Sequence, residues 1–146
     1  MTRVGVIGAG AFGTALALAQ AVRGAPVVLW GRDPAAMAAM HATRTAPALP
    51  VVPLPSEILV TPDLGAVAGC EVILLSIPTQ ALRGFLTDHG AGLGAAVLVA
   101  CCKGVERGTG LLPTQIIADV LPGVRTAVLT GPSFADDIAR GKPTAL

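Results

Sequence analysis

The chain has 146 residues, the length of one ordinary domain; 53% of them are hydrophobic and only 13% are charged. This composition excludes a disordered chain, because a globular domain usually carries about 25% charged residues. Ten Lys and Arg against nine Asp and Glu give a net charge of +1, so the chain lacks the basic surface that nucleic acid or anionic lipid would need.

The uncharged run over residues 4–22 is long enough to suggest a signal peptide or a membrane span. Several glycines near its start would break a helix there, however, and residues 3–7 are strand-like. The run therefore divides into a short strand, a turn and an alanine-rich helix over 11–23. We expect neither secretion nor membrane insertion.

Short apolar runs alternate with helix-like stretches along the whole chain. Strands are expected at residues 3–7, 27–30, 58–61, 71–77, 96–102 and 126–130. Helices are expected at residues 11–23, 34–43, 64–68, 80–89, 111–121 and 132–140. The strand runs are apolar almost throughout, which is typical of strands covered on both faces. The pattern predicts an α/β fold with a doubly wound, mostly parallel sheet, as one domain over residues 1–146.

The first strand is followed by glycines with the spacing G-x-G-x-x-G. Gly8 would permit a tight turn, Gly10 would let a diphosphate approach the backbone, and Gly13 would let helix and strand pack closely. The free N–H groups at the helix start would bind the phosphates. A plain glycine-rich turn is the alternative, but the strand, spacing and helix together favour a Rossmann-type dinucleotide site.

The end of the second strand bears on which dinucleotide is bound. An NAD site usually has Asp or Glu there to bind the ribose 2′-hydroxyl. In this chain Arg32 comes first, and a guanidinium can pair with a 2′-phosphate; a solvated loop charge is the alternative. Asp33 most simply caps the helix that begins at Pro34, although it could still reach a 2′-hydroxyl. We expect NADPH to be preferred, with some use of NADH.

The three cysteines show no metal-binding spacing. Cys101 and Cys102 are adjacent and would point to opposite faces of a strand, and Cys70 is far from both in sequence. We expect reduced cysteines that pack in the interior, and no metal site.

Seven short motifs, in order along the chain, resemble those of the bacterial NAD(P)-dependent glycerol-3-phosphate dehydrogenases. They are 8–17, 29–33, 49–50, 77–79, Lys-Gly-Val-Glu at 103–106, Gly-Pro-Ser-Phe-Ala at 131–135, and 143–145. The glycine motif alone fits many families. Lys-Gly-Val-Glu followed by Gly-Pro-Ser-Phe-Ala is much more specific, and the resemblance covers the whole chain.

The resemblance implies contacts at the matching positions. For the coenzyme these are Gly8, Gly10, Ala11, Phe12, Gly13, Arg32, Asp33, Pro78, Lys103 and Ala135; for the substrate they are Lys103, Gly131 and Ser133. Two positions depart from the family. Ala11 stands where Ser is common and loses a hydroxyl donor, and Asp33 stands where a basic residue is common, which weakens the case for a 2′-phosphate.

The residue types suit the substrate of that family, dihydroxyacetone phosphate, which is a dianionic ketone. Lys103 follows a strand, where ligands bind in such sheets, and offers a cation; a surface charge is the alternative. Gly131 and Ser133 are expected at a helix start that suits an anionic group, with Ser133 as a simple cap the alternative.

The resemblance places the family's proton-donating lysine in a second, helical domain, downstream of the stretch that matches residues 143–146. We therefore expect no catalytic residue in this chain, which would be the cytoplasmic coenzyme-binding domain of an enzyme that is a homodimer at full length. Alone it would bind coenzyme with little or no turnover.

Other functions stay open beside the NAD(P)H-dependent reduction of dihydroxyacetone phosphate to sn-glycerol 3-phosphate, a glycerophospholipid precursor. A ketopantoate or 6-phosphogluconate type reductase has a similar architecture, but the motifs at 103–106 and 131–135 argue against it. A non-catalytic nucleotide-sensing module would need only residues 8–13.

Overall fold

The computed structural model of the chain describes residues 1–145. Its strands are β1 (Val4–Ile7), β2 (Val27–Trp30), β3 (Ile58–Thr61), β4 (Val72–Leu75), β5 (Val97–Ala100) and β6 (Thr126–Val128). Its helices are α1 (Ala11–Val22), α2 (Pro34–Thr43), α3 (Gly65–Ala68), α4 (Thr79–His89), the 3-10 helix η1 (Gly90–Leu93), α5 (Pro113–Val120) and α6 (Ala135–Ala139). Every expected element is present, with ends shifted by up to three residues.

The six strands form one sheet in the order β3-β2-β1-β4-β5-β6, and every neighbouring pair is parallel. The predicted doubly wound Rossmann-type fold is confirmed. The strand order reverses between β1 and β4, which lie side by side with Ile7 opposite Leu75. In such sheets ligands bind in the crevice beyond the carboxyl ends of the strands at this reversal.

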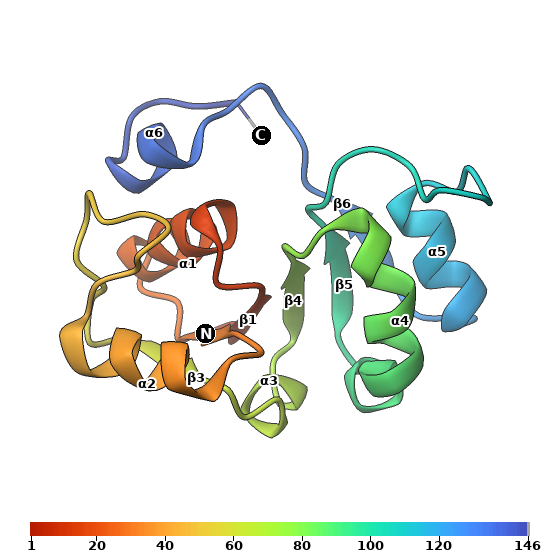
Figure 1. Cartoon of the computed structure of the whole chain (residues 1–146), viewed down its shortest axis with the longest axis horizontal. Coiled ribbons are helices and arrows are strands. Elements are labelled where there is room, and N and C mark those ends of the chain that lie inside the picture. The colour runs from red at the N-terminus through yellow and green to blue at the C-terminus, as the bar shows by residue number, and fades with distance from the viewer. Residues whose placement is uncertain (146) are drawn as a thin grey trace.

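Helices cover the two faces of the sheet (Figure 1). Side chains alternate along each central strand, so Val6 belongs to the core cluster that includes α1 and α2 residues, whereas Ile7 belongs to the cluster that includes α3, α4 and α5 residues. Both residues are fully buried. Burying such a side chain contributes about 1.5–3 kcal/mol, so the carboxyl end of β1 is held firmly from both faces.

The expectation that every strand is covered on both faces is wrong for β6, whose three residues are all exposed. The reason is where the chain goes next. After β6 it crosses the top of the sheet, and α6 packs against α1 instead of covering β6 (Figure 1). The edge strand is therefore left without a helical layer on that side.

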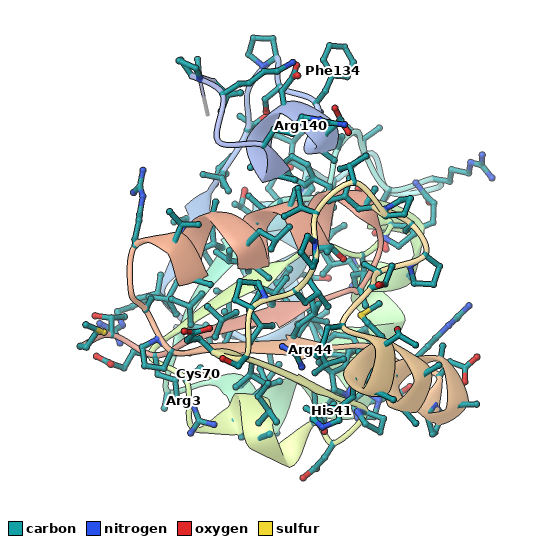
Figure 2. The ribbon with its side chains drawn as sticks, turned by 90° about the vertical axis from the view of Figure 1, so that its left-hand side faces the viewer. Arg3, His41, Arg44, Cys70, Phe134 and Arg140 are labelled. Carbon is teal, nitrogen blue, oxygen red and sulfur yellow. The ribbon has the colours of Figure 1, made fainter. Side chains whose placement is uncertain are left out.

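The last helix begins at Ala135, not at Pro132 as predicted. Ser133 N–H donates to the Gly131 carbonyl at 2.9 Å, and Phe134, the residue before the helix, has an extended backbone. This tight turn uses the residues that would have formed the first helical turn. The Phe134 ring projects from it at the top of Figure 2 and is 76% exposed.

The proline-rich stretch after α2 has no helix or strand but is firmly packed. Its Ala46, Leu49 and Leu54 side chains are buried in the core around α1. The Arg44 guanidinium lies beneath the loop, where it donates to the carbonyls of Leu54, Pro55 and Ile58 (Figure 2). Within residues 1–145, no helix combines the length and the apolar character that crossing a bilayer would demand.

Candidate functional site

The glycine-rich turn joins the carboxyl end of β1 to the start of α1. Gly8 N–H donates to the Trp30 carbonyl at the end of β2, at 3.0 Å, which ties the turn to the neighbouring strand. Gly10 is the N-cap of α1, and no side chain caps the helix. No acidic residue occupies its first turn either. The N–H groups of that turn point beyond the helix and remain available to an anion.

The three glycines of the motif have different surroundings, and those of Gly8 and Gly13 match the tight turn and the close packing predicted from the sequence. Gly8 has a φ of +112°, and a Cβ there would lie 2.3 Å from the Ser76 carbonyl oxygen. At Gly13 a Cβ would lie 1.9 Å from the Gly8 carbonyl oxygen. At Gly10 a Cβ would meet nothing within 4 Å. Gly8 and Gly13 are therefore required by the packing of the protein itself, whereas Gly10 borders open space.

Lys103 and Phe12 are far apart in sequence but meet in the fold. The Lys103 ammonium lies 5.6 Å from the centroid of the Phe12 ring, within range of a cation–π interaction. Phe12 belongs to the first turn of α1, and Lys103 follows β5. An exposed cation therefore stands beside the free N–H groups of α1, which makes the crevice favourable for negatively charged ligands.

Arg32 and Asp33 lie just beyond the carboxyl end of β2. Asp33 caps α2 as predicted: its Oδ1 accepts from Ala35 N–H at 2.9 Å and from Ala36 N–H at 3.2 Å. Arg32 is exposed, and no ion pair within residues 1–145 includes it. The carboxylate is thus occupied by the backbone of α2, while the guanidinium is accessible from solution.

The predicted substrate residues after β6 are not at a helix start. Gly131 and Ser133 precede α6 by a turn, and the N-cap of α6 is Phe134, so the alternative of Ser133 as a cap is wrong as well. Asp136 and Asp137 lie in the first turn of α6, which makes that helix end unsuitable for an anion. Neither residue therefore offers the N–H groups of a helix start to a substrate.

Ser133 has a different property. Its Oγ is buried and has no hydrogen-bond partner among residues 1–145, a property shared by the Thr14 hydroxyl in α1. Buried hydroxyls nearly always find a partner, so an unsatisfied one marks a place where a bound group could supply it. Ala135, two residues later, packs against the same apolar cluster as Ala11 and Phe12. The 131–135 segment therefore lies on the α1 side of the crevice.

Pro78 ends the turn after β4 and is the exposed N-cap residue of α4. The polar residues that follow it were not predicted as site residues, although Thr79 belongs to the 77–79 motif. Thr79, Gln80 and Arg83 all bond to the segment after β5, and Arg83 pairs with Glu106 at 2.8 Å. The only signal in the sequence is Glu106 itself, a charged residue in the Lys-Gly-Val-Glu motif, because nothing local shows which helix it faces.

The cysteines are free and at least partly buried, as expected for reduced packing residues. Burial raises the pKa of the Cys101 thiol to about 12, and the pKa values of Cys70 and Cys102 are raised for the same reason. These thiols therefore stay protonated and are poor nucleophiles at neutral pH. Among residues 1–145, no group of three His, Cys, Asp or Glu side chains is placed to hold a metal ion.

One cavity of the structure lies away from the glycine turn. A groove of about 810 Å³ runs between the second half of α1 and α6, lined by apolar residues such as Leu18, Ala19 and Ile138 together with the segment 141–144. None of the residues 8–13 lines it. The groups that the crevice offers to a ligand are the uncapped main-chain N–H groups of α1 and the exposed Lys103 and Arg32 cations.

Comparison with known proteins gives one consistent result. The family model described as the N-terminus of NAD-dependent glycerol-3-phosphate dehydrogenase matches residues 3–146. The curated glycerol-3-phosphate dehydrogenase (NAD(P)+) of Ruegeria sp. strain TM1040 is 50% identical over 144 residues, which are 98% of this chain and 45% of that protein. The enzyme of the same name from Paracoccus denitrificans is 50% identical over 143 residues, covering 98% and 44%.

Solved structures agree. The crystal structure of glycerol-3-phosphate dehydrogenase from Coxiella burnetii has a TM-score of 0.91 and 31% identity, and the match covers 98% of this chain and 45% of that one. A putative F420-dependent NADP-reductase from Arthrobacter matches at 20% identity with a TM-score of 0.68, which shows a shared fold alone. The chain spans less than half the length of the curated relatives that it matches.

Proposed function

The chain belongs to the NAD-dependent glycerol-3-phosphate dehydrogenase family, whose N-terminal part it matches, and from that premise we propose that residues 1–146 are the NAD(P)-binding domain of such an enzyme. The reaction would be reduction of dihydroxyacetone phosphate to sn-glycerol 3-phosphate. The observation that carries this proposal is the glycine turn, where packing requires Gly8 and Gly13 while Gly10 borders open space. A turn that binds no ligand would require glycine only where packing demands it, and packing does not demand glycine at position 10.

The first turn of α1 would bind the coenzyme diphosphate. Its N–H groups are uncapped, and the side of the turn at Gly10 would admit a group that a Cβ would exclude. Ala11 contributes no hydroxyl, so the main chain and the helix dipole must supply the attraction here. The bound coenzyme would supply the hydride, and the residues of this chain would bind the coenzyme and orient it.

We propose that NADPH is preferred and that NADH is also used. Arg32 is exposed at the end of β2 and suits a 2′-phosphate. Asp33 places a negative charge beside Arg32, and this charge would repel the 2′-phosphate. The Asp33 Oδ1, however, accepts hydrogen bonds from two N–H groups of α2. The guanidinium is therefore the group best placed to select between the coenzymes.

Lys103 and Ser133 would contact the substrate, and Lys103 would also contact the coenzyme. The Lys103 ammonium beside Phe12 offers a positive charge to a phosphate or a carbonyl oxygen. The buried Ser133 hydroxyl would gain the hydrogen-bond partner that it lacks within residues 1–145. Gly131 joins this set through the turn in which its carbonyl accepts from Ser133 N–H. Pro78 and Ala135 would contribute contacts to the coenzyme.

We further propose that the proton donor to the substrate carbonyl is not among these 146 residues. The curated relatives are more than twice as long as the stretch that matches, and the family resemblance places that lysine in the remaining part. This chain would then bind coenzyme and substrate with little or no turnover. The resemblance also implies a homodimeric enzyme in the cytoplasm that supplies glycerophospholipid synthesis.

Calorimetric titration tests the proposal. We expect NADPH to bind more tightly than NADH; if neither binds, the coenzyme site is wrong, and if NADH binds at least tenfold more tightly, the preference is wrong. Glycerol 3-phosphate is then titrated with coenzyme present. Binding of this second ligand supports a dehydrogenase domain, whereas its absence favours a nucleotide-sensing module.

A further inference from the structure

The segment that carries Lys103 is held in place by side chains of α4. Residues 103–107 leave β5 without forming a helix or a strand of their own. Thr79 Oγ1 donates to the Lys103 carbonyl at 2.6 Å, and Gln80 Nε2 donates to the Val105 carbonyl at 2.8 Å. The main chain on both sides of Gly104 is thus bonded to the first two residues of α4.

Gln80 makes two bonds to this segment. Besides donating to Val105, its Oε1 accepts from Arg107 N–H at 3.0 Å. One side-chain amide therefore satisfies a carbonyl and an N–H two residues apart, much as a neighbouring strand would. The pairing fixes the path of the chain across residues 105–107 although no strand lies there.

Glu106 adds a charged anchor between those two contacts. Arg83 donates from two nitrogens to its two carboxylate oxygens, at 2.8 and 3.0 Å, and Thr109 Oγ1 donates at 2.6 Å. Glu106 is only 8% exposed, and the hydrogen bonds from Arg83 and Thr109 keep its pKa below the ordinary value. Arg83 also reaches Asp119 on α5 at 2.6 Å, so the anchor joins two helices.

We propose that Gln80 is a positioning residue, acting together with Thr79 and Arg83. These three side chains lie along the first turns of α4, and their bonds hold the 103–107 segment so that the Lys103 ammonium stays over the Phe12 ring. Lys103 would then already be ordered when a phosphate-bearing ligand binds. Only the identity of that ligand rests on the proposed function.

The physical benefit is preorganisation. Lys103 itself is exposed, and residues 103–107 form no helix or strand, so local structure restrains the lysine little. Ordering a side chain of this kind at the moment of binding costs roughly 0.5–1.5 kcal/mol, equivalent to about a two- to tenfold loss of affinity. The contacts from α4 lower that cost, because they fix the main chain from which the Lys103 side chain projects.

A double-mutant cycle tests the proposal with NADPH as the probe. Gln80→Ala should weaken NADPH binding about two- to tenfold, whereas Asp88→Ala, at the exposed far end of the same helix, should leave it unchanged. In the Lys103→Ala chain, Gln80→Ala should have no further effect, because nothing remains to be positioned. An unchanged affinity in Gln80→Ala, or the same loss with and without Lys103, would overturn the proposal.

A second readout needs no ligand. In the parent chain, NMR should detect a contact between the Lys103 side-chain methylenes and the Phe12 ring, and Gln80→Ala should weaken it while Asp88→Ala does not. A contact that persists in Gln80→Ala contradicts positioning by α4. If instead Lys103→Ala binds NADPH as tightly as the parent does, the role proposed for Lys103 is wrong, and the NMR contact alone decides whether Gln80 positions it.

Discussion

The two sides of the crevice are built in opposite ways. On the β1 side, the turn at residues 8–13 is made by main chain and by missing side chains: a Cβ at Gly13 would lie 1.9 Å from the Gly8 carbonyl oxygen. On the β5 side, the segment at 103–107 is held by polar side chains from α4 and by a buried carboxylate. The first side depends on close packing and the second on hydrogen bonds.

This difference determines how each side responds to change. Interiors are close-packed, so an added methyl group at Gly8 or Gly13 must displace backbone. A hydrogen bond from an exposed side chain can be lost while the fold persists, because water replaces the missing partner. We therefore expect substitutions at Gly8 and Gly13 on the β1 side to affect folding, and those at Gln80 on the β5 side to affect binding more than folding.

The largest expected effect is that of Gly13→Ala. Since the new methyl group would overlap the Gly8 carbonyl, the free energy of unfolding should fall by about 3 kcal/mol, the upper end of overpacking costs. Urea denaturation measures this directly. Gly10→Ala is the matched control, and its stability should change by less than about 1 kcal/mol, because a Cβ there meets nothing. Equal losses in the two variants would contradict this account of the turn.

Gly10→Ala should separate binding from folding on the same turn. The methyl group would occupy the space proposed for the diphosphate, so NADPH affinity should fall about tenfold, equivalent to about 1.4 kcal/mol, with the urea midpoint nearly unchanged. Calorimetry gives the affinity. An unchanged dissociation constant would show that the open space beside Gly10 is not where the phosphates bind.

Acid should weaken the β5 side first through Glu106. Its pKa in the folded chain is below the ordinary 4.5, because Arg83 and Thr109 hydrogen-bond the charged form. The group thus stabilises the fold fully above about pH 4.5 and loses this contribution as the pH falls through the lowered pKa. The difference in unfolding free energy between the parent and Glu106→Gln should be constant at neutral pH and shrink in acid. A difference that stays constant down to pH ~3 would contradict the lowered pKa.

The smallest effect is expected at the end of β2. Asparagine caps a helix as well as aspartate does, so Asp33→Asn should keep the stability while removing the negative charge beside Arg32. NADPH binding should tighten about two- to threefold, with NADH unaffected, because exposed charges interact weakly across water. Asp33→Ala, which also loses the cap, should cost about 1 kcal/mol of stability. Equal changes in affinity for both coenzymes would show that Asp33 does not select between them.

Local patterns in the sequence were sufficient for the glycine turn and for most of the fold. The spacing of Gly8, Gly10 and Gly13 directly after a strand predicted three different roles, and the structure shows the tight turn at Gly8 and the close packing at Gly13. The Asp33 cap and the order of strands and helices were equally predictable. These features depend on residues close together in the chain, where backbone preferences and hydrophobic period act directly.

Only the tertiary structure decided what lies across the crevice. The contact of Lys103 with Phe12, the two bonds of Gln80 and the pairing of Arg83 with Glu106 join residues at least 23 positions apart. The exposure of β6 and the late start of α6 likewise follow from α6 packing on α1. Such pairings depend on which strands become neighbours in the sheet. Side-chain type and spacing along the chain do not determine that strand order.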